Sequence, residues 1–145
     1  GDVTAYKFPT TEMPGLSFSF SGIKTAFLYF LRDSVAEDKD FVRKNIHNIC
    51  ASFQAALVNM LILKLKKASK VTGIKNIAIA GGVSANSGLR EALLMEAKKH
   101  RWKVFIPKLE YCTDNAAMIA ITAHYKFLAK EFCDLNVSPE PRMKI

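Results

Sequence analysis

The segment that most constrains the fold is a short apolar run that ends in two glycines and leads into a helix. Residues 75–80 form a short, mostly apolar run with β-branched side chains at Ile77 and Ile79, and Gly81-Gly82 ends the run. Apolar residues then recur at helical spacing over residues 87–101, and a second strand-like run, residues 102–106, stops at Pro107. This succession predicts two parallel strands joined by a right-handed helical crossover.

Long helical patterns flank this unit. Residues 41–69 carry apolar side chains at three- and four-residue steps, and Gly73 stands where a left-handed residue often ends a helix. A last helix is predicted over residues 115–132. The chain is therefore predicted to be a helix-rich α/β fold. Two strands make a poor sheet, so we expect the rest of that sheet to lie outside this chain.

The first 40 residues carry weaker signals. The lead-in up to Gly15 is polar and extended, and residues 16–21 alternate apolar and hydroxyl side chains, which predicts a short half-buried strand. A helix over Ile23–Arg32, capped by Ser21, should follow. We expect residues 1–40 to pack as a lead-in on a lobe formed by residues 41–135, with residues 136–145 as a loosely held tail.

Composition excludes several classes of protein. The chain has 145 residues, 50% hydrophobic and 23% charged, which is typical of one folded domain. No secretory signal pattern and no run of 18 uninterrupted apolar residues occurs, so we expect no membrane partner. Cys50, Cys112 and Cys133 are odd in number and lack metal-type spacing, which favours a reducing cytoplasm. Cys50 is interpreted as a small core residue rather than a nucleophile.

The net charge of +8 has two interpretations. Basic residues cluster at positions 64–70, at positions 98–101 and at Arg142 and Lys144. The first two clusters close predicted helices, where cations complement the negative helix end, and this is the interpretation we favour. The alternative is a surface for a polyanion such as tRNA.

The glycine turn, residues 81–86, is the strongest candidate site. Gly81 and Gly82 would lie at the carboxyl end of a parallel strand, the edge at which open α/β sheets bind ligands. The helix that follows offers free N–H groups and a positive dipole end to a phosphate. The alternative is an ordinary tight turn without a ligand. Asn86 likewise has two interpretations, a helix cap or a ligand contact.

A second candidate lies in the Cys-Thr-Asp-Asn segment at residues 112–115. Thr113 or Asp114 is suited to cap the last helix, which is the commoner role of such residues. Asp114 also follows the second predicted strand, so it should open on the same cleft as the glycine turn. A carboxylate that faces bound phosphates commonly serves a metal ion.

Other motifs fail on spacing. The segment Gly22-Ile23-Lys24-Thr25 resembles the end of a P-loop, but Ile23 stands where that motif has lysine and position 17 is Ser17 instead of glycine. The three histidines lie on predicted helices without a nucleophile motif or a zinc-helix pattern, so the sequence gives no support to a protease.

Three motifs in order resemble one family: Phe-Ser-Phe-Ser-Gly-Ile-Lys-Thr at residues 18–25, Gly-Gly-Val-Ser-Ala-Asn at residues 81–86, and Cys-Thr-Asp-Asn-Ala-Ala at residues 112–117. The chain resembles the C-terminal lobe of the TsaD family, the tRNA N6-adenosine threonylcarbamoyltransferases, formerly called glycoproteases. The resemblance implies a lobe of the actin/hexokinase/Hsp70 type (ribonuclease H-like). It also implies transfer of a threonylcarbamoyl group from threonylcarbamoyl-adenylate to N6 of adenosine 37 in tRNAs that read codons beginning with A.

The resemblance also assigns roles to residues. It implies that Asn86 contacts the adenylate, that Gly81 and Gly82 approach its phosphate region, and that Asp114 binds one divalent metal ion, iron or zinc. It assigns no catalytic residue to this chain. The remaining metal ligands, a histidine pair four residues apart, would belong to the N-terminal lobe.

Two further expectations follow from the resemblance. A TsaB-like paralogue and a TsaE-like ATPase are expected as partners, and this chain alone is expected to be inactive. A non-catalytic scaffold subunit of the same complex is the alternative, although such a subunit would have little reason to keep Asp114 within an intact Thr-Asp-Asn motif.

Overall fold

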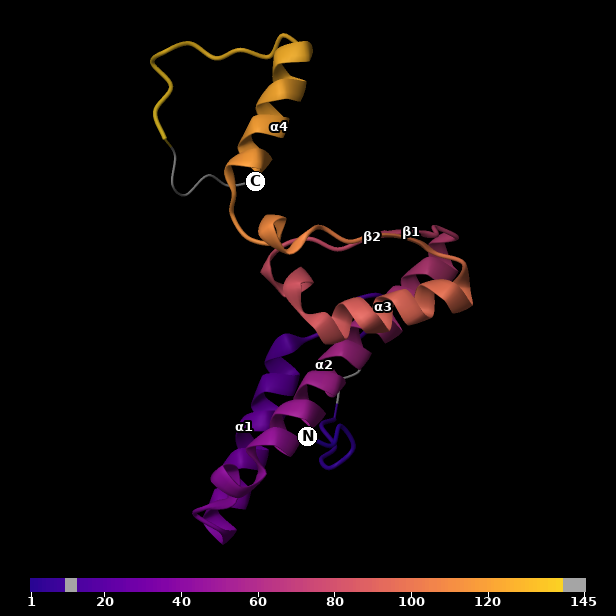
Figure 1. Cartoon of the computed structure of the whole chain (residues 1–145), viewed down its shortest axis with the longest axis vertical. Coiled ribbons are helices and arrows are strands. Elements are labelled where there is room, and N and C mark those ends of the chain that lie inside the picture. Colours follow the sequence, from indigo (N-terminus) through magenta and orange to yellow (C-terminus); the bar gives the residue numbers. More distant parts are fainter. Residues whose placement is uncertain (10–12, 140–145) are drawn as a thin grey trace.

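The structure, a computed structural model, describes residues 1–9 and 13–139. Figure 1 shows the order of the elements. They are α1 (Phe20–Glu37), α2 (Phe41–Thr72), β1 (Asn76–Ala78), the 3-10 helix η1 (Gly82–Ala85), α3 (Ser87–His100), β2 (Lys103–Phe105), the 3-10 helix η2 (Leu109–Tyr111) and α4 (Ala116–Leu128). Within the described ranges, the sheet consists of β1 and β2, which pair in parallel with Ile77 opposite Val104. The predicted α/β unit is confirmed.

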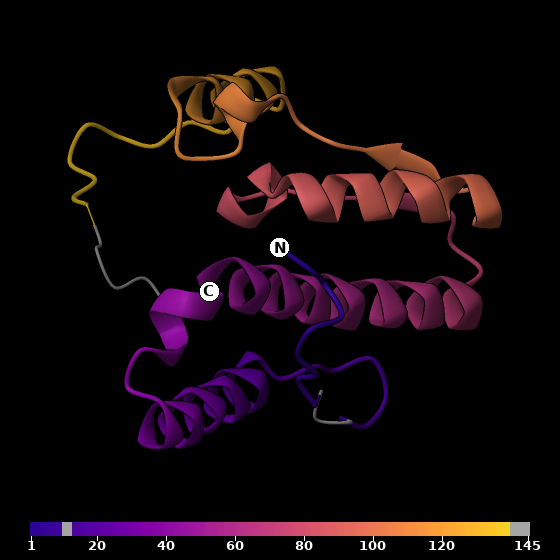
Figure 2. The same ribbon diagram turned by 60° about the horizontal axis from the view of Figure 1, so that its bottom comes forward.

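Helix α2 lies at the centre of the molecule, with α1 on one side and α3 on the other (Figure 2). It ends as predicted at Gly73, whose φ of 72° is left-handed. The main core lies between α2, α3 and the sheet, and Leu93 at its centre is fully buried. Its other buried members are Ile62, Ile77, Leu89, Ala97 and Trp102. The buried indole of Trp102 donates to Ser69 Oγ at 2.9 Å, so burying its polar nitrogen leaves no donor unpaired.

The predicted strand over residues 16–21 is wrong. Helix α1 begins at Phe20, and Ser19 rather than Ser21 caps it by accepting a hydrogen bond from Gly22 N at 3.2 Å. Phe18 and Phe20 are 42% and 49% exposed, so the alternation does not mark a buried face. The helix is also longer than predicted: it continues through the mostly polar residues 33–37 and ends where Asp38 N donates to Ser34 O.

The lead-in packs on α2 and α1. Ser52 of α2 accepts from Tyr6 N and donates to Asp2 O, at 3.2 and 3.0 Å. The buried Phe8 contacts the rings of Phe27, Phe30 and Phe53 edge-on, with ring centroids 5.2 to 5.6 Å apart. The predicted boundaries at residues 40 and 135 stay predictions, and residues 140–145 of the predicted tail, with Arg142 and Lys144, lie outside the described residues.

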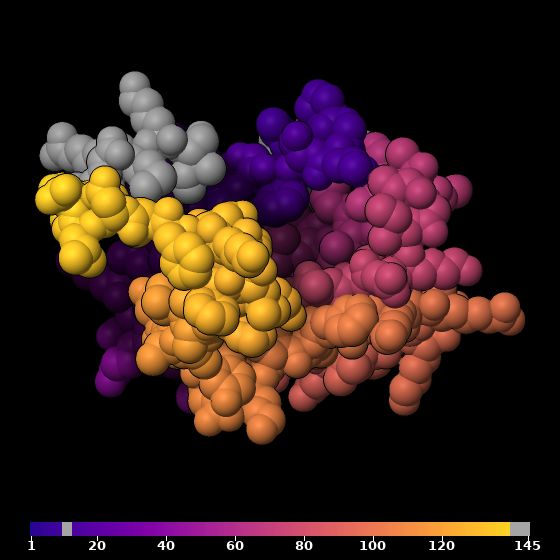
Figure 3. Space-filling view, turned by 90° about the horizontal axis from the view of Figure 1, so that it is seen from above, coloured from indigo at the N-terminus to yellow at the C-terminus, as the bar shows by residue number. Residues whose placement is uncertain are grey.

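Helix α4 is apolar but uncovered. It stands away from the other helices in Figure 1 and forms part of the near face in Figure 3, and none of its residues is buried. Ile119 and Tyr125 are 74% and 65% exposed. The described residues therefore provide no partner for the close packing that Ala116, Ala117 and Ala120 would permit.

Helix α2 is apolar enough on average to be a candidate membrane span, although it contains no run of 18 uninterrupted apolar residues. An 18-residue window of α2 has a mean hydropathy of 1.5, which by length and composition alone is enough to cross a membrane. This is weak evidence for insertion, since core helices of soluble proteins pass the same test. Here α1 and α3 pack against α2, and 22% of the window is buried.

Glu96 of α3 is the centre of an ion-pair cluster. Its carboxylate lies 2.9 Å from Lys66 Nζ, 2.6 Å from Lys99 Nζ and 3.2 Å from His100 Nε2, and its side chain is only 13% exposed. Hydrogen bonds from Lys99 and then from Lys66 lower the pKa of Glu96 from 4.5 to about 2. The charged carboxylate therefore stabilises the fold above pH 4.5, and that stabilisation is lost as the pH falls through the folded-state pKa.

We expect Glu96→Gln to lower the melting temperature at pH 7, because it removes the charge that Lys66 and Lys99 share. The difference from the unsubstituted protein should narrow as the pH is lowered from 4.5 to 2, as thermal unfolding at a series of pH values would show. Glu91→Gln, at an exposed glutamate of the same helix, is the control and should change little. A Glu96→Gln effect equally large at pH 2 and pH 7 would contradict this explanation.

Candidate functional site

The glycine turn has a backbone conformation that only glycine adopts readily. Gly81 has φ 76° and ψ 177°, a region that is strained for any residue with a Cβ. Ser84 holds the turn: its backbone N and its Oγ both donate to Gly81 O, at 2.9 and 2.7 Å. Ser84 is 1% exposed, so this arrangement is fixed from inside the protein. The turn is predicted correctly, and Gly81 is required by its own geometry.

Gly82 differs from its neighbour. Its φ is not positive, and a Cβ added to it would meet no atom of the described chain within 4 Å. The packing of the described residues therefore gives no reason for glycine at this position. A ligand that comes close to the backbone would give one.

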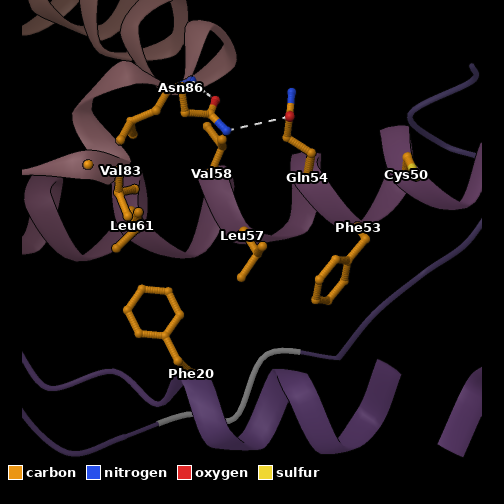
Figure 4. A pocket seen from close by; sticks show the side chains of 11 residues that line it. Phe20, Cys50, Phe53, Gln54, Leu57, Val58, Leu61, Val83 and Asn86 are labelled. Carbon is orange, nitrogen blue, oxygen red and sulfur yellow. Dashed lines mark hydrogen bonds between the residues drawn. The ribbon is translucent and has the colours of Figure 1, made fainter. Parts of the chain in front are cut away.

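A cavity of about 570 Å³ lies beneath the turn. Figure 4 shows Asn86 and Val83 on one side of it, Phe20 of α1 on the opposite side, and side chains of α2 between them. The other lining residues are Cys50, Phe53, Gln54, Leu57, Val58, Leu61, Gly82 and Leu89. The volume and the mostly apolar lining with a few polar groups are typical of small-molecule sites.

Asn86 performs the cap role that was one of its two interpretations. Its Oδ1 accepts from Leu89 N at 2.9 Å and so caps α3. Its Nδ2 points along the cavity and reaches Gln54 Oε1 only at 3.5 Å, the dashed line in Figure 4. The cap occupies the oxygen and leaves the amide hydrogens available to a ligand.

Arg90 ties the glycine turn to the loop that follows β2. Its Nε donates to Ser84 O at 2.6 Å, and its Nη2 lies 2.8 Å from Pro107 O and 3.1 Å from the sulfur of Cys112. Cys112 is 2% exposed. One half-buried guanidinium thus holds together the two segments that leave the carboxyl ends of β1 and β2, which lie at the same end of the sheet in Figure 1.

Asp114 lies two residues beyond Cys112. The predicted cap by Thr113 or Asp114 is wrong, because Asn115 caps α4 through Oδ1, which accepts from Met118 N at 3.1 Å. Asp114 is exposed and makes no hydrogen bond or ion pair with another described residue. It does not line the cavity itself. Its carboxylate is therefore free of any structural role within residues 1–9 and 13–139.

The sequence model of the TsaD family, described as tRNA N6-adenosine threonylcarbamoyltransferase, matches residues 1–121. The chain belongs to the TsaD family. It is 53% identical over its whole length to the tRNA N6-adenosine threonylcarbamoyltransferase of Cytophaga hutchinsonii, and 54% identical over 99% of its length to that of Christiangramia forsetii. The enzyme of the same name from Porphyromonas gingivalis is 48% identical over the whole chain. The chain spans about 42% of the length of each of these relatives.

Within this TsaD-family chain, three residues act on the site without having been singled out from the sequence. Ser84 holds the glycine turn, Arg90 joins the turn to the second loop, and Gln54 of α2 faces Asn86. Ser84 lies within the glycine-turn motif, although its role in holding Gly81 was not predicted. The contacts of Arg90 with Pro107 and of Gln54 with Asn86 span 17 and 32 residues, so no local pattern indicates them. Cys50, predicted to be a core residue, is instead exposed and lines the cavity, because it lies on the face of α2 turned toward the turn.

Proposed function

We propose that the full-length protein moves a threonylcarbamoyl group from threonylcarbamoyl-adenylate to N6 of adenosine 37 in tRNA. This chain supplies one wall of the adenylate cleft, as one lobe of a two-lobed fold of the actin/hexokinase/Hsp70 type. The relatives' names and the family match support the reaction, and the glycine turn supports the position of the site.

The observation that carries the proposal is the open space at Gly82. The turn places a backbone without Cβ atoms at the carboxyl edge of the sheet, next to the first turn of α3. That first turn leaves backbone N–H groups without helical partners and carries a positive dipole end. An adenylate phosphate is stabilised in such a place, with the Asn86 amide as an additional donor.

In this reaction the leaving group is the phosphate of AMP, and its negative charge must be stabilised as it forms. The N6 amine attacks the carbamoyl carbon, the bond from that carbon to the phosphate oxygen breaks, AMP leaves as an anion, and N6 loses a proton. Donors fixed before the reaction stabilise the developing negative charge without reorganisation. The glycine turn and the start of α3 are rigid enough for this role, because Ser84 and Arg90 hold them from the interior.

We further propose that Asp114 supplies one ligand to a divalent metal ion, iron or zinc. Its exposed and unengaged carboxylate fits that role. Among the described residues no group of three or more His, Cys, Asp or Glu side chains could hold a metal, so the other ligands would come from the N-terminal lobe. When bound, the metal would polarise the carbamoyl-phosphate group.

The remaining partners follow from the same proposal. We propose a TsaB-like paralogue and a TsaE-like ATPase as protein partners, and the cytoplasm, where tRNA is modified, as the location. The three free cysteines are compatible with a reducing compartment.

The size of residue 82 provides the test. In the full-length protein, Gly82→Ala should reduce transfer about tenfold or more and Gly82→Val about a hundredfold or more, because each added carbon would occupy space assigned to the adenylate. The melting temperature should stay within about 2 °C for Gly82→Ala, because a Cβ at residue 82 meets no described atom within 4 Å. Transfer by Gly82→Val is measured at a temperature at which its thermal melt shows that it is folded. The measurement is the formation of modified adenosine in a tRNA transcript supplied with threonylcarbamoyl-adenylate.

Two results would count against the proposal. Full activity of Gly82→Val would show that no ligand approaches the turn. Unsubstituted full-length protein that binds tRNA but forms no product, even with its partners added, would favour the non-catalytic scaffold.

A further inference from the structure

A second pocket lies at the opposite, amino edge of the sheet. Lys75 precedes β1 and Trp102 precedes β2, so both strands begin there. The ends of α2 and α3 reach the same edge, as the right-hand side of Figure 1 shows. The pocket has a volume of about 570 Å³. We call its lining the basic pocket: Lys66, Lys67, Ser69, Lys70, Gly73, Lys75, His100 and Trp102.

The charge of the basic pocket exceeds what the helix ends require. Two helix C-termini carry roughly −0.5 charge each, and the Glu96 carboxylate adds one more negative charge beside Lys66. Together these make about two negative charges, against four lysines in the lining. Lys67, Lys70 and Lys75 are exposed and make no ion pair with any described residue. The net charge of the basic pocket is therefore positive, and the negative helix ends do not account for all four lysines.

The basic pocket offers little to a protein partner. Protein interfaces gain most of their affinity from aromatic or aliphatic anchors that become fully buried. Trp102 is the one large apolar side chain in the lining and is already 92% buried, with His100 stacked on it at a centroid distance of 5.1 Å. Trp102 also cannot stack on a nucleobase. What remains accessible is positive charge on flexible side chains, which binds phosphates without reading bases.

The position of the basic pocket favours a long ligand. Residues 75 to 81 run through β1 from the basic pocket to the glycine turn, a distance of up to roughly 20 Å at the rise of an extended chain. An adenylate bound at the glycine turn does not reach that far. A polyanion that occupies both ends of the sheet must be a macromolecule.

We propose that the basic pocket binds the phosphate backbone of the tRNA at a point away from the modified adenosine. This inference rests on the proposed function, which makes tRNA the substrate. Lys67, Lys70 and Lys75 neutralise phosphates, and Lys66, held by Glu96, adds a fixed charge beside them. The contact contributes affinity and orientation and carries no sequence preference.

The test removes three charges at once from the full-length protein. Lys67→Gln/Lys70→Gln/Lys75→Gln is compared with a matched control, Lys7→Gln/Lys39→Gln/Lys130→Gln, which removes three exposed lysines outside the pocket. Binding of a tRNA transcript is measured at several salt concentrations. The pocket variant should bind tRNA at least tenfold more weakly, and the slope of log K against log salt should fall by about 2 to 3, because each neutralised phosphate contributes about 0.7 to 0.9.

Separate readouts distinguish this inference from the proposed function. At saturating tRNA the pocket variant should keep its kcat while its KM for tRNA rises, and the control should match the unsubstituted protein in both. A pocket variant that binds tRNA as tightly as the control overturns the inference. So does a pocket variant that keeps tRNA but loses binding of polyglutamate, because the surface would then serve an acidic protein. Loss of transfer in the unsubstituted protein would instead overturn the proposed function and leave the binding comparison valid.

Discussion

Replacing Asp114 with alanine is expected to lower threonylcarbamoyl transfer by the full-length protein at least 10³-fold while leaving its melting temperature unchanged. The large effect follows from the proposed metal ligand: polarisation by a bound cation contributes several kcal/mol, and about 4 kcal/mol corresponds to 10³ in rate. The small effect on stability follows from the exposed carboxylate, which has no partner among the described residues. Product formation measures transfer and thermal melting measures stability. The metal content of the purified protein should fall, because one ligand is lost.

Glu110→Ala is the matched control for Asp114→Ala. Glu110 lies in η2, is also exposed, and makes one long ion pair, 3.9 Å from Lys108. Its removal should alter transfer less than about twofold, because Glu110 is not assigned as a metal ligand. If Asp114→Ala kept its metal and its activity, the assignment of Asp114 as a ligand would be wrong.

The second large effect is expected at Arg90. Arg90→Met keeps the apolar stem of the side chain but leaves Ser84 O and Pro107 O without their donor, and hydrogen bonds to a charged group contribute about 1.5 to 3 kcal/mol each. Because Arg90 is only half-buried, we expect a fall in the free energy of unfolding below the full sum of the two bonds, about 2 to 4 kcal/mol in urea denaturation. Transfer should fall more than about tenfold under conditions in which the protein remains folded, because the turn and the Asp114 loop lose their common anchor.

Arg90→Lys separates positioning from stability. Lysine keeps the positive charge but has a single nitrogen, so it cannot bridge two loops as the planar guanidinium does. It should therefore recover part of the stability and little of the transfer, with the loss in kcat larger than any change in KM for tRNA. Arg43→Met, at an exposed arginine 3.4 Å from Asp40, is the control and should cost less than about 0.5 kcal/mol. Recovery of both properties by Arg90→Lys would limit Arg90 to a structural role.

The fold was predictable wherever a local signal and a long-range one agreed. The apolar stripe of α2, Gly73 at its end and the two short strands around α3 all appear in the structure near their predicted bounds. The prediction of a strand over residues 16–21 failed because six residues that alternate apolar and hydroxyl side chains fit a strand and also fit the capped start of a helix. The side chains Phe20, Ile23, Phe27 and Phe30, spaced three and four apart, continue the helical pattern back through the alternation.

The candidate site was predictable only in part, for a physical reason. A glycine pair after a strand and an asparagine before a helix are local signals, and the turn and the cap that were one interpretation of each are present in the structure. Their contact with a ligand stays a prediction. The choice of Asn115 over Thr113 or Asp114 as cap depends on backbone geometry that neighbouring capping residues do not specify. The bonds of Arg90 to Pro107 and Cys112 span 17 and 22 residues, and nothing in the sequence near Arg90 indicates them.

Missense changes at the two glycines of the turn are expected to differ in their effect on the amount of folded protein in a cell. Any substitution at Gly81 introduces a Cβ into a backbone region where the strain is of order 1–3 kcal/mol, so the variant is present at lower abundance because more of it unfolds. A Cβ at Gly82 meets no atom of the described chain within 4 Å, so a substitution by alanine is expected to leave abundance unchanged. Alleles that change Gly81 should therefore be rescued by a lower growth temperature or by overexpression. Alleles that change Gly82 should be rescued by neither.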